Sequence, residues 1–101
     1  MRVSEVEKRI IRENIVQVFG EEVTVYLFGS RVDDRKRGGD IDLLVLAHGS
    51  NAELFEKKLI VLGGIQRELG ERKIDMITWD EHSQKSEPAI VREALSTGVL
   101  L

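Results

Sequence analysis

The sequence predicts an α/β fold, in which a small mixed sheet is flanked by helices, and two observations support it. Three segments have apolar residues at the spacing of one helix face, and three others are short runs of β-branched, aromatic or other apolar residues. These segments follow one another in the order α-β-β-α-β-α, which favours helices packed against a single sheet. At 101 residues, we expect one domain that spans residues 1–101.

The predicted elements have clear boundaries. The helical patterns cover Val3–Phe19, Leu54–Leu69 and Ile90–Leu95, and the strand patterns cover Val23–Phe28, Ile41–Ala47 and Lys73–Trp79. Serine followed by glutamate three residues later predicts a capping box at Ser4 and another at Ser50. Gly63-Gly64 costs the second helix about 1 kcal/mol per glycine relative to alanine, which leaves a kink open at this point. Pro88 is predicted at an early position of the third helix, and Val99–Leu101 is either a short edge strand or a frayed tail.

Composition excludes several classes of protein. A net charge of −3 argues against a protein that coats nucleic acid, because such proteins are usually basic. The absence of cysteine excludes disulfides and thiolate metal sites. No apolar run approaches the roughly 18 residues of a membrane span, and the first residues lack the apolar core of a signal peptide. We therefore expect a cytoplasmic protein.

Two acids open the second predicted strand. Asp40 and Asp42 are two positions apart, and side chains two positions apart on a strand point to the same side. Carboxylates placed in this way repel each other, so a divalent cation between them is the expected partner. The alternative is that Asp40 ends the preceding Gly-Gly loop while Asp42 caps or pairs with a basic residue. The basic residues available nearby are Arg35, Lys36 and Arg37.

A glycine–serine turn precedes the acids and completes a recognisable pattern. Gly29-Ser30-Arg31 follows an apolar strand and is followed by Asp40-Ile41-Asp42-Leu43. This arrangement resembles the signature of the polymerase-beta-like nucleotidyltransferase superfamily. At this length the chain looks like a member of the minimal nucleotidyltransferase group, and the resemblance covers most of the chain. The alternative for Gly29-Ser30 alone is an ordinary turn with an N-cap serine.

The resemblance implies a role for each residue of the pattern. Gly29 and Ser30 would hold the triphosphate of the incoming nucleotide, and Asp40 and Asp42 would bind two Mg²⁺ ions, which Mn²⁺ could replace. The third acid of the family matches Asp75, which would share a metal and accept the proton of the attacking hydroxyl. Two roles stay open. Asp75 could instead form a salt bridge with Arg72 or Lys73, and Arg31 is either a phosphate contact or a solvated loop residue.

Three further residues attract attention for weaker reasons. His48 and His82 are interpreted as surface residues rather than ligands, and Trp79 as a core or partner contact rather than a base-stacking platform. Trp79 and Val99–Leu101 are candidate contacts for a partner, although they could equally complete the core.

The resemblance also implies an activity and a partner. The implied reaction transfers a nucleoside monophosphate, AMP from ATP, to a hydroxyl, with magnesium as the cofactor. Many proteins of this group are antitoxins that act on a tyrosine of a helical HEPN toxin, so a hetero-oligomer with such a toxin is expected, with a homodimer also open. The alternatives are a non-catalytic antitoxin that works by binding, and an antibiotic-type transferase that needs a partner domain.

Overall fold

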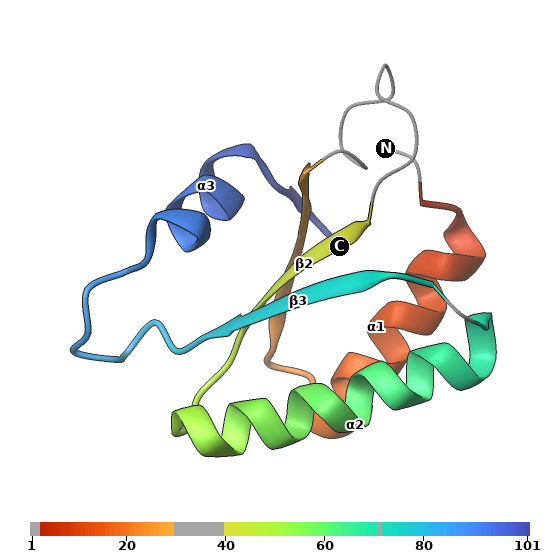
Figure 1. Cartoon of the computed structure of the whole chain (residues 1–101), viewed down its shortest axis with the longest axis horizontal. Helices are drawn as coiled ribbons and strands as arrows, with labels where there is room; N and C mark the ends of the chain where they lie inside the picture. Colours follow the sequence, from red (N-terminus) through yellow and green to blue (C-terminus); the bar gives the residue numbers. More distant parts are fainter. Residues whose placement is uncertain (1–2, 30–39, 71) are drawn as a thin grey trace.

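The computed structural model describes residues 3–29, 40–70 and 72–101 (Figure 1). Its elements are α1 (Glu5–Phe19), β1 (Thr24–Phe28), β2 (Ile41–Leu46), α2 (Asn51–Leu69), β3 (Ile74–Trp79), α3 (Ala89–Thr97) and β4 (Val99–Leu100). The α/β class and the order α-β-β-α-β-α are confirmed, and β4 follows as the short edge strand that was one of the two alternatives for the end of the chain. No helix in the described ranges is both long and apolar enough to cross a membrane.

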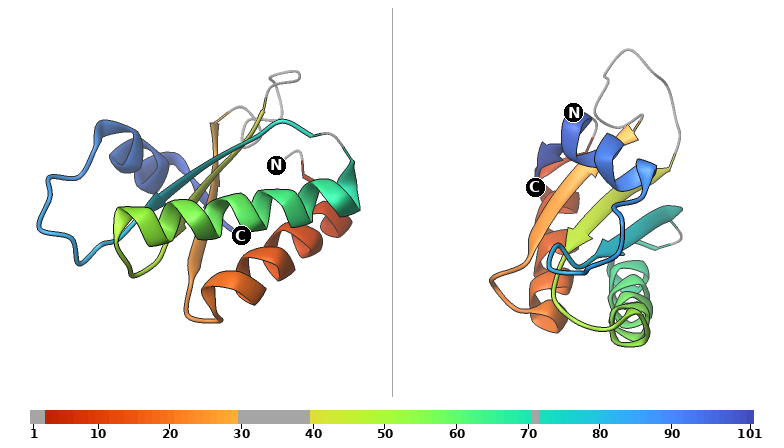
Figure 2. Two further views of the ribbon diagram at one scale, coloured as in Figure 1. Left: turned by 60° about the horizontal axis from the view of Figure 1, so that its bottom comes forward. Right: turned by 90° about the vertical axis from the view of Figure 1, so that its left-hand side faces the viewer.

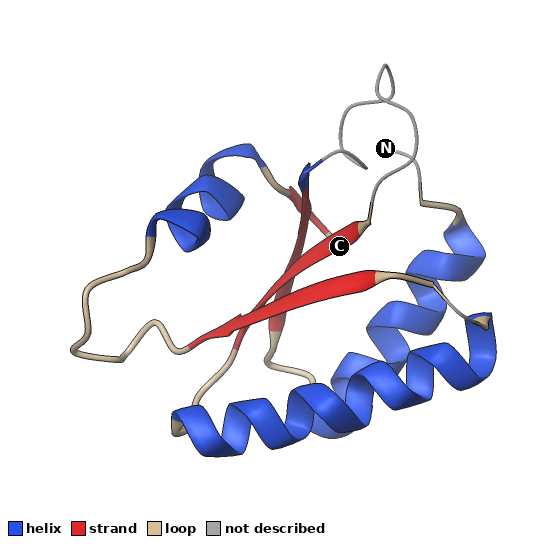
Figure 3. Cartoon of the chain, in the orientation of Figure 1, coloured by secondary structure: helices blue, strands red, loops and turns tan. Residues whose placement is uncertain are grey.

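The four strands form one mixed sheet in the order β3-β2-β1-β4 (Figure 3). β1 pairs antiparallel with both of its neighbours, whereas β2 and β3 run parallel. The parallel pair requires a crossover, which α2 supplies. As a result, β2 and β3 begin at the same end of the sheet, and both of these strand starts carry predicted site residues.

The helix boundaries follow the capping signals of the sequence. The hydroxyls of Ser4 and Ser50 each accept a hydrogen bond from the backbone N–H three residues on, at 3.1 and 3.2 Å, and the two glutamates return the contact. Pro88 is the N-cap of α3 and therefore precedes its first turn rather than lying within it. The helix α2 runs unbroken through Gly63 and Gly64, the point at which a kink was considered.

Alternation along the strands divides the core into two layers. Leu43 and Val45 pack with α1 and α2 on one face, whereas Leu44 and Leu46 pack with α3 on the other (Figure 2). β2 is thus covered on both faces, as its nearly continuous apolar run predicted. Leu101 is buried in the first layer, so part of the chain end completes the core.

Gly64 of α2 lies against Asn14 of α1. A Cβ at this position would collide with Oδ1 of Asn14, whose amide donates a 2.8 Å hydrogen bond to the Ile10 carbonyl. Gly63 has open space around it, with only the tip of Arg67 within 4 Å. A side chain at position 63 therefore needs no rearrangement, whereas one at position 64 requires the Asn14 side chain to move.

These two neighbours form a matched pair for a stability measurement. We expect Gly63→Ala to raise the free energy of unfolding by about 1 kcal/mol through helix propensity. Gly64→Ala should gain less, because Asn14 must first move and its hydrogen bond to the Ile10 carbonyl, worth about 0.5–1.5 kcal/mol, would be disturbed. Urea titration of both variants measures the difference, and equal stabilisation by the two substitutions would show that α1 and α2 are not held this closely.

Candidate active site

The acids of β2 and β3 lie side by side on one face of the sheet. Asp42 and Asp75 are register partners in the parallel pair, which places their backbones about 4.7–4.9 Å apart. Their neighbours along each strand pack with α1 and α2, so both carboxylates point to the α3 face. On the far side of Asp42, the register partner is Phe28 of β1. The sheet therefore carries a row of three side chains, Phe28, Asp42 and Asp75.

An open groove of about 560 Å³ surrounds this pair. It is lined by Phe28, Gly29, Asp42, Lys58, Ile74, Asp75, Met76, Ile77, Ile90 and Glu93. Lys58 comes from α2 and Glu93 from α3, so the groove extends around the outer side of β3. These two residues were not identified from the sequence, since nothing in a single helix shows which strand edge its side chains will reach.

Gly29 borders the acid pair from the end of β1. Its backbone has φ of 77°, which favours glycine, and a Cβ at this position would collide with Oδ2 of Asp42. Backbone and carboxylate can approach this closely only because position 29 has no side chain. The predicted importance of this glycine thus has a physical cause, namely the space that Asp42 occupies.

Asp40 lies just before β2 and has a basic partner. Its carboxylate is 3.6 Å from Nζ of Lys73, and their side chains are 29% and 80% exposed. Pairing of these acids with a basic residue was considered above as an alternative to metal binding. The observed partner is Lys73, whereas the sequence suggested Arg35, Lys36 or Arg37. The other basic residue at the start of β3, Arg72, donates to Glu7 at 2.9 Å. Neither pairs with Asp75, so the salt-bridge alternative for that residue finds no support in residues 3–29, 40–70 and 72–101.

The electrostatics of the pair centre on Asp42. Partial burial raises the pKa of Asp42 above its ordinary value, and the charges of Asp75 and Asp40 raise it further. The negative charges of Asp75 and Asp40 therefore both act on Asp42. In the described part of the chain the three carboxylates are nevertheless not gathered into a compact group of three metal-binding side chains. Asp42 and Asp75 lie side by side on adjacent strands, whereas the carboxylate of Asp40 lies near the ammonium group of Lys73.

Several predicted residues lie outside the described ranges. Ser30 and Arg31 belong to this set, as do the alternative partners Arg35, Lys36 and Arg37. Their assignments to phosphate binding or to ion pairing stay predictions.

Comparison with known proteins identifies the fold that carries this groove. Residues 13–101 match the family described as Polymerase beta, Nucleotidyltransferase. The chain belongs to this family. It is also similar to a chain in the crystal structure of a mutant of the toxin–antitoxin pair MntA-HpeT, with a TM-score of 0.60 and 18% identity, over 93% of this chain and 70% of that one. No curated protein matches the chain.

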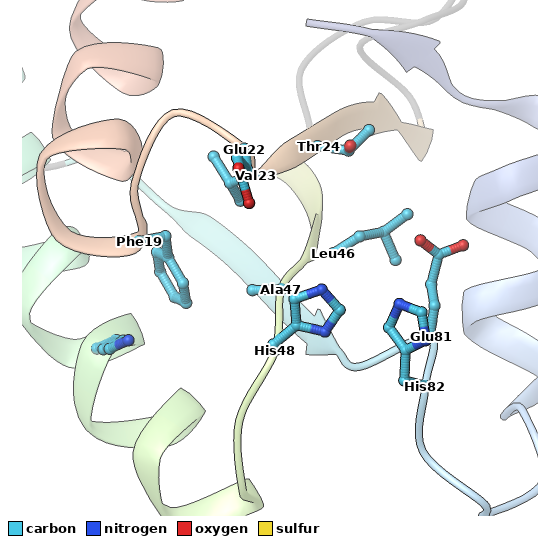
Figure 4. Close-up of a pocket in the computed structure, with 10 residues that line it drawn as sticks. Phe19, Glu22, Val23, Thr24, Leu46, Ala47, His48, Glu81 and His82 are labelled. Carbon is cyan, nitrogen blue, oxygen red and sulfur yellow. The ribbon is translucent and has the colours of Figure 1, made fainter.

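A second cavity of this nucleotidyltransferase family member lies at the opposite end of β2 and β3. It has a volume of about 170 Å³, and Figure 4 shows His48 and His82 together in its lining. Their ring centroids are 4.5 Å apart, and Nδ1 of His48 is 3.4 Å from the carboxylate of Asp80. Asp80 also accepts backbone hydrogen bonds from Gly49 and His82, and these bonds, the one from Gly49 foremost, lower its pKa.

The two histidines therefore lie where the loop after β2 and the loop after β3 are joined through Asp80. Asp80 connects the segment after β2 with the segment after β3, and a backbone hydrogen bond of 3.0 Å from Ala47 to the Trp79 carbonyl reinforces the connection. Trp79 itself is partly buried and packs against the α3 layer, which confirms the core interpretation of this residue. The groove with Asp42 and Asp75 remains the candidate active site.

Proposed function

We propose that this protein is a metal-dependent nucleotidyltransferase that transfers AMP from ATP to a tyrosine hydroxyl of a HEPN-type toxin and so acts as its antitoxin. The observation that carries the proposal is the register pairing of Asp42 with Asp75, next to Gly29, in an open groove. The two carboxylates on adjacent strands concentrate negative charge in the groove. Because Gly29 has no side chain, a ligand could approach its backbone closely. Membership of the nucleotidyltransferase family supports the reaction class.

The chain's own residues suggest how the reactants are placed. Gly29 lies on the β1 side of Asp42, so the triphosphate would approach from that side, where Ser30 follows in the sequence. Asp75 lies on the β3 side, so the acceptor hydroxyl would approach from there. Its oxygen attacks the α-phosphorus and forms the new P–O bond, while the bond to the β-phosphate oxygen breaks and pyrophosphate leaves. Asp75 accepts the hydroxyl proton and later releases it to water.

The donor set fits a magnesium cofactor. Carboxylate oxygens are ligands that Mg²⁺ prefers, and it often uses only one or two of them together with substrate phosphates and water. Asp42 and Asp75 would hold it from adjacent strands, and Asp40 would join once it exchanges its contact with Lys73, a residue that is largely exposed. When bound, the metal neutralises the charge of the phosphates and of the leaving pyrophosphate.

The partner is proposed from two features. The similar structure is that of a toxin–antitoxin pair. In this chain, three large apolar side chains of α2, those of Phe55, Leu59 and Ile60, are more than half exposed, which favours association with another protein. A partner bound in this way would supply the acceptor hydroxyl.

The test is to incubate the protein with the toxin-like product of a neighbouring gene, or with whatever protein co-purifies. With ATP and Mg²⁺, the intact mass of the partner should rise by one or more AMP units, and titration calorimetry should show ATP binding that depends on the metal.

Two controls sharpen this test. A chelator should abolish the mass change, and replacing the modified tyrosine of the partner by phenylalanine should remove it. If the complex forms but the mass of the partner does not change, the proposed transferase activity is contradicted. That result would favour an antitoxin that acts by binding alone.

A further inference from the structure

The outer edge of β3 offers unpaired backbone groups. Among the described strands, β3 lies at one end of the sheet and pairs only with β2. The carbonyls of Lys73 and Trp79 accept hydrogen bonds from Ile41 and Ala47, on the β2 side. Because backbone groups alternate in direction along a strand, those of Ile74, Met76 and Thr78 point to the outer edge, where Ile74 and Thr78 are partly exposed and Met76 is buried. No strand of the described ranges covers them.

This edge has few of the features that usually prevent strand addition. Natural sheets protect their edges with very short strands, proline, lysine or bulges. β4, at the other end of the sheet, is two residues long and fits that rule. β3 has six residues in uninterrupted register with β2, with neither proline nor lysine among them. Its one charged residue is Asp75, whose side chain lies in the candidate site.

The open edge and the acid pair share one groove. Ile74, Met76 and Ile77 of β3 line it together with both acids. Lys58 of α2 closes one side, and Ile90 and Glu93 of α3 close the other. A segment that lies along β3 in this groove would therefore pass directly beside Asp75.

We propose that the acceptor binds as an extended segment, which adds a fifth strand to the outer edge of β3 and places its hydroxyl residue opposite Asp75. The inference rests on the proposed function and names the conformation of its substrate. Side chains of directly opposed residues lie on the same face, about 4.5–5.5 Å apart at Cβ. The row formed by Phe28, Asp42 and Asp75 would thus gain a fourth member, the acceptor side chain, on the face that carries the acids.

The groove also predicts the chemistry around the acceptor. Two positions along the added strand, the side chain on the same face would meet Ile77 and Ile90, so it should be apolar. The lining has three acids, Asp42, Asp75 and Glu93, against one base, Lys58, so flanking basic residues are favoured. The expected substrate is a flexible loop or tail with alternating apolar residues around its hydroxyl, rather than the face of a formed helix.

The test uses a synthetic eight-residue peptide with a central tyrosine, alternating valines and a lysine at each end. It is added up to millimolar concentration to the isotope-labelled protein with magnesium and a non-hydrolysable ATP analogue. Saturable NMR shifts and slower hydrogen exchange are expected at the amides of Ile74, Met76 and Thr78. Absence of both effects, or shifts centred on the outer face of α2, would overturn the proposal.

Two variants isolate the backbone contact. Thr78→Pro removes an outward N–H, which edge strands tolerate, and should weaken peptide binding about tenfold, whereas Thr78→Val should leave it unchanged. The same peptide with N-methylated backbone amides tests the contact with the unaltered protein and should also fail to bind. Equal affinity for both peptides refutes strand addition. Peptide binding without AMP transfer to any acceptor would instead refute the proposed reaction, so the two failures are distinguishable.

Discussion

Replacing Asp42 by asparagine is expected to abolish AMP transfer while the protein stays folded. Asp42 is the acid on which the other two act electrostatically, and it lies against Gly29 and beside Asp75. An amide keeps the shape but lacks the negative charge that would hold magnesium. Loss of metal stabilisation worth several kcal/mol corresponds to a rate reduction of about a thousandfold or more. Intact-mass analysis of the acceptor over time measures the rate.

The same substitution should stabilise the metal-free protein at neutral pH. The folded-state pKa of Asp42 is raised, so the folded protein holds this proton more tightly than the unfolded chain does. The carboxyl therefore opposes folding once pH rises through its folded pKa, and this penalty is absent below its unfolded pKa. Asp42→Asn should raise the melting temperature at pH 7 in the presence of a chelator, and the difference should disappear in acid.

A matched control comes from the other end of the sheet. Glu81→Gln also removes one negative charge, from an exposed residue at the cavity with the two histidines rather than in the groove. It should leave both the transfer rate and its metal dependence unchanged. Near-normal transfer by Asp42→Asn would show that the site has been assigned to the wrong residues.

Asp75→Asn is expected to reduce turnover by about 10²–10⁴-fold, the usual contribution of a general base. The physical reason is its position, since it lies at the outer strand, where the acceptor hydroxyl would approach, and next to Asp42. Its side chain is exposed and has no ion-pair partner among the described residues, so the melting temperature should change little. Single-turnover rates and thermal unfolding of the same sample give both values.

A purely structural role of Asp75 would give the opposite pair of results. If Asp75 instead stabilises β3 through a salt bridge, Asp75→Asn should lower the melting temperature while the folded fraction keeps its activity.

Much of this molecule is specified by local sequence. Both capping boxes formed where serine and glutamate were three positions apart, because a cap needs only the residues of one helical turn. The strand runs also formed within about one residue of their predicted limits, and alternation fixed which side chains share a face. Gly29, Asp40 and Asp42 were selected as candidates from a turn and two charges that are visible in the chain itself, whereas Asp75 was selected through the family resemblance.

Contacts between distant segments were decided only by the tertiary structure. The pairing of Asp42 with Asp75 depends on the register of two parallel strands joined by α2, and a shift of one residue would turn Asp75 to the other face. The ion pair of Asp40 with Lys73 and the close approach of Gly64 to Asn14 likewise join residues from separate elements. The open edge of β3 exists because the chain places that strand last in the sheet. Such features arise from the packing of whole elements against one another, which no single stretch of sequence encodes.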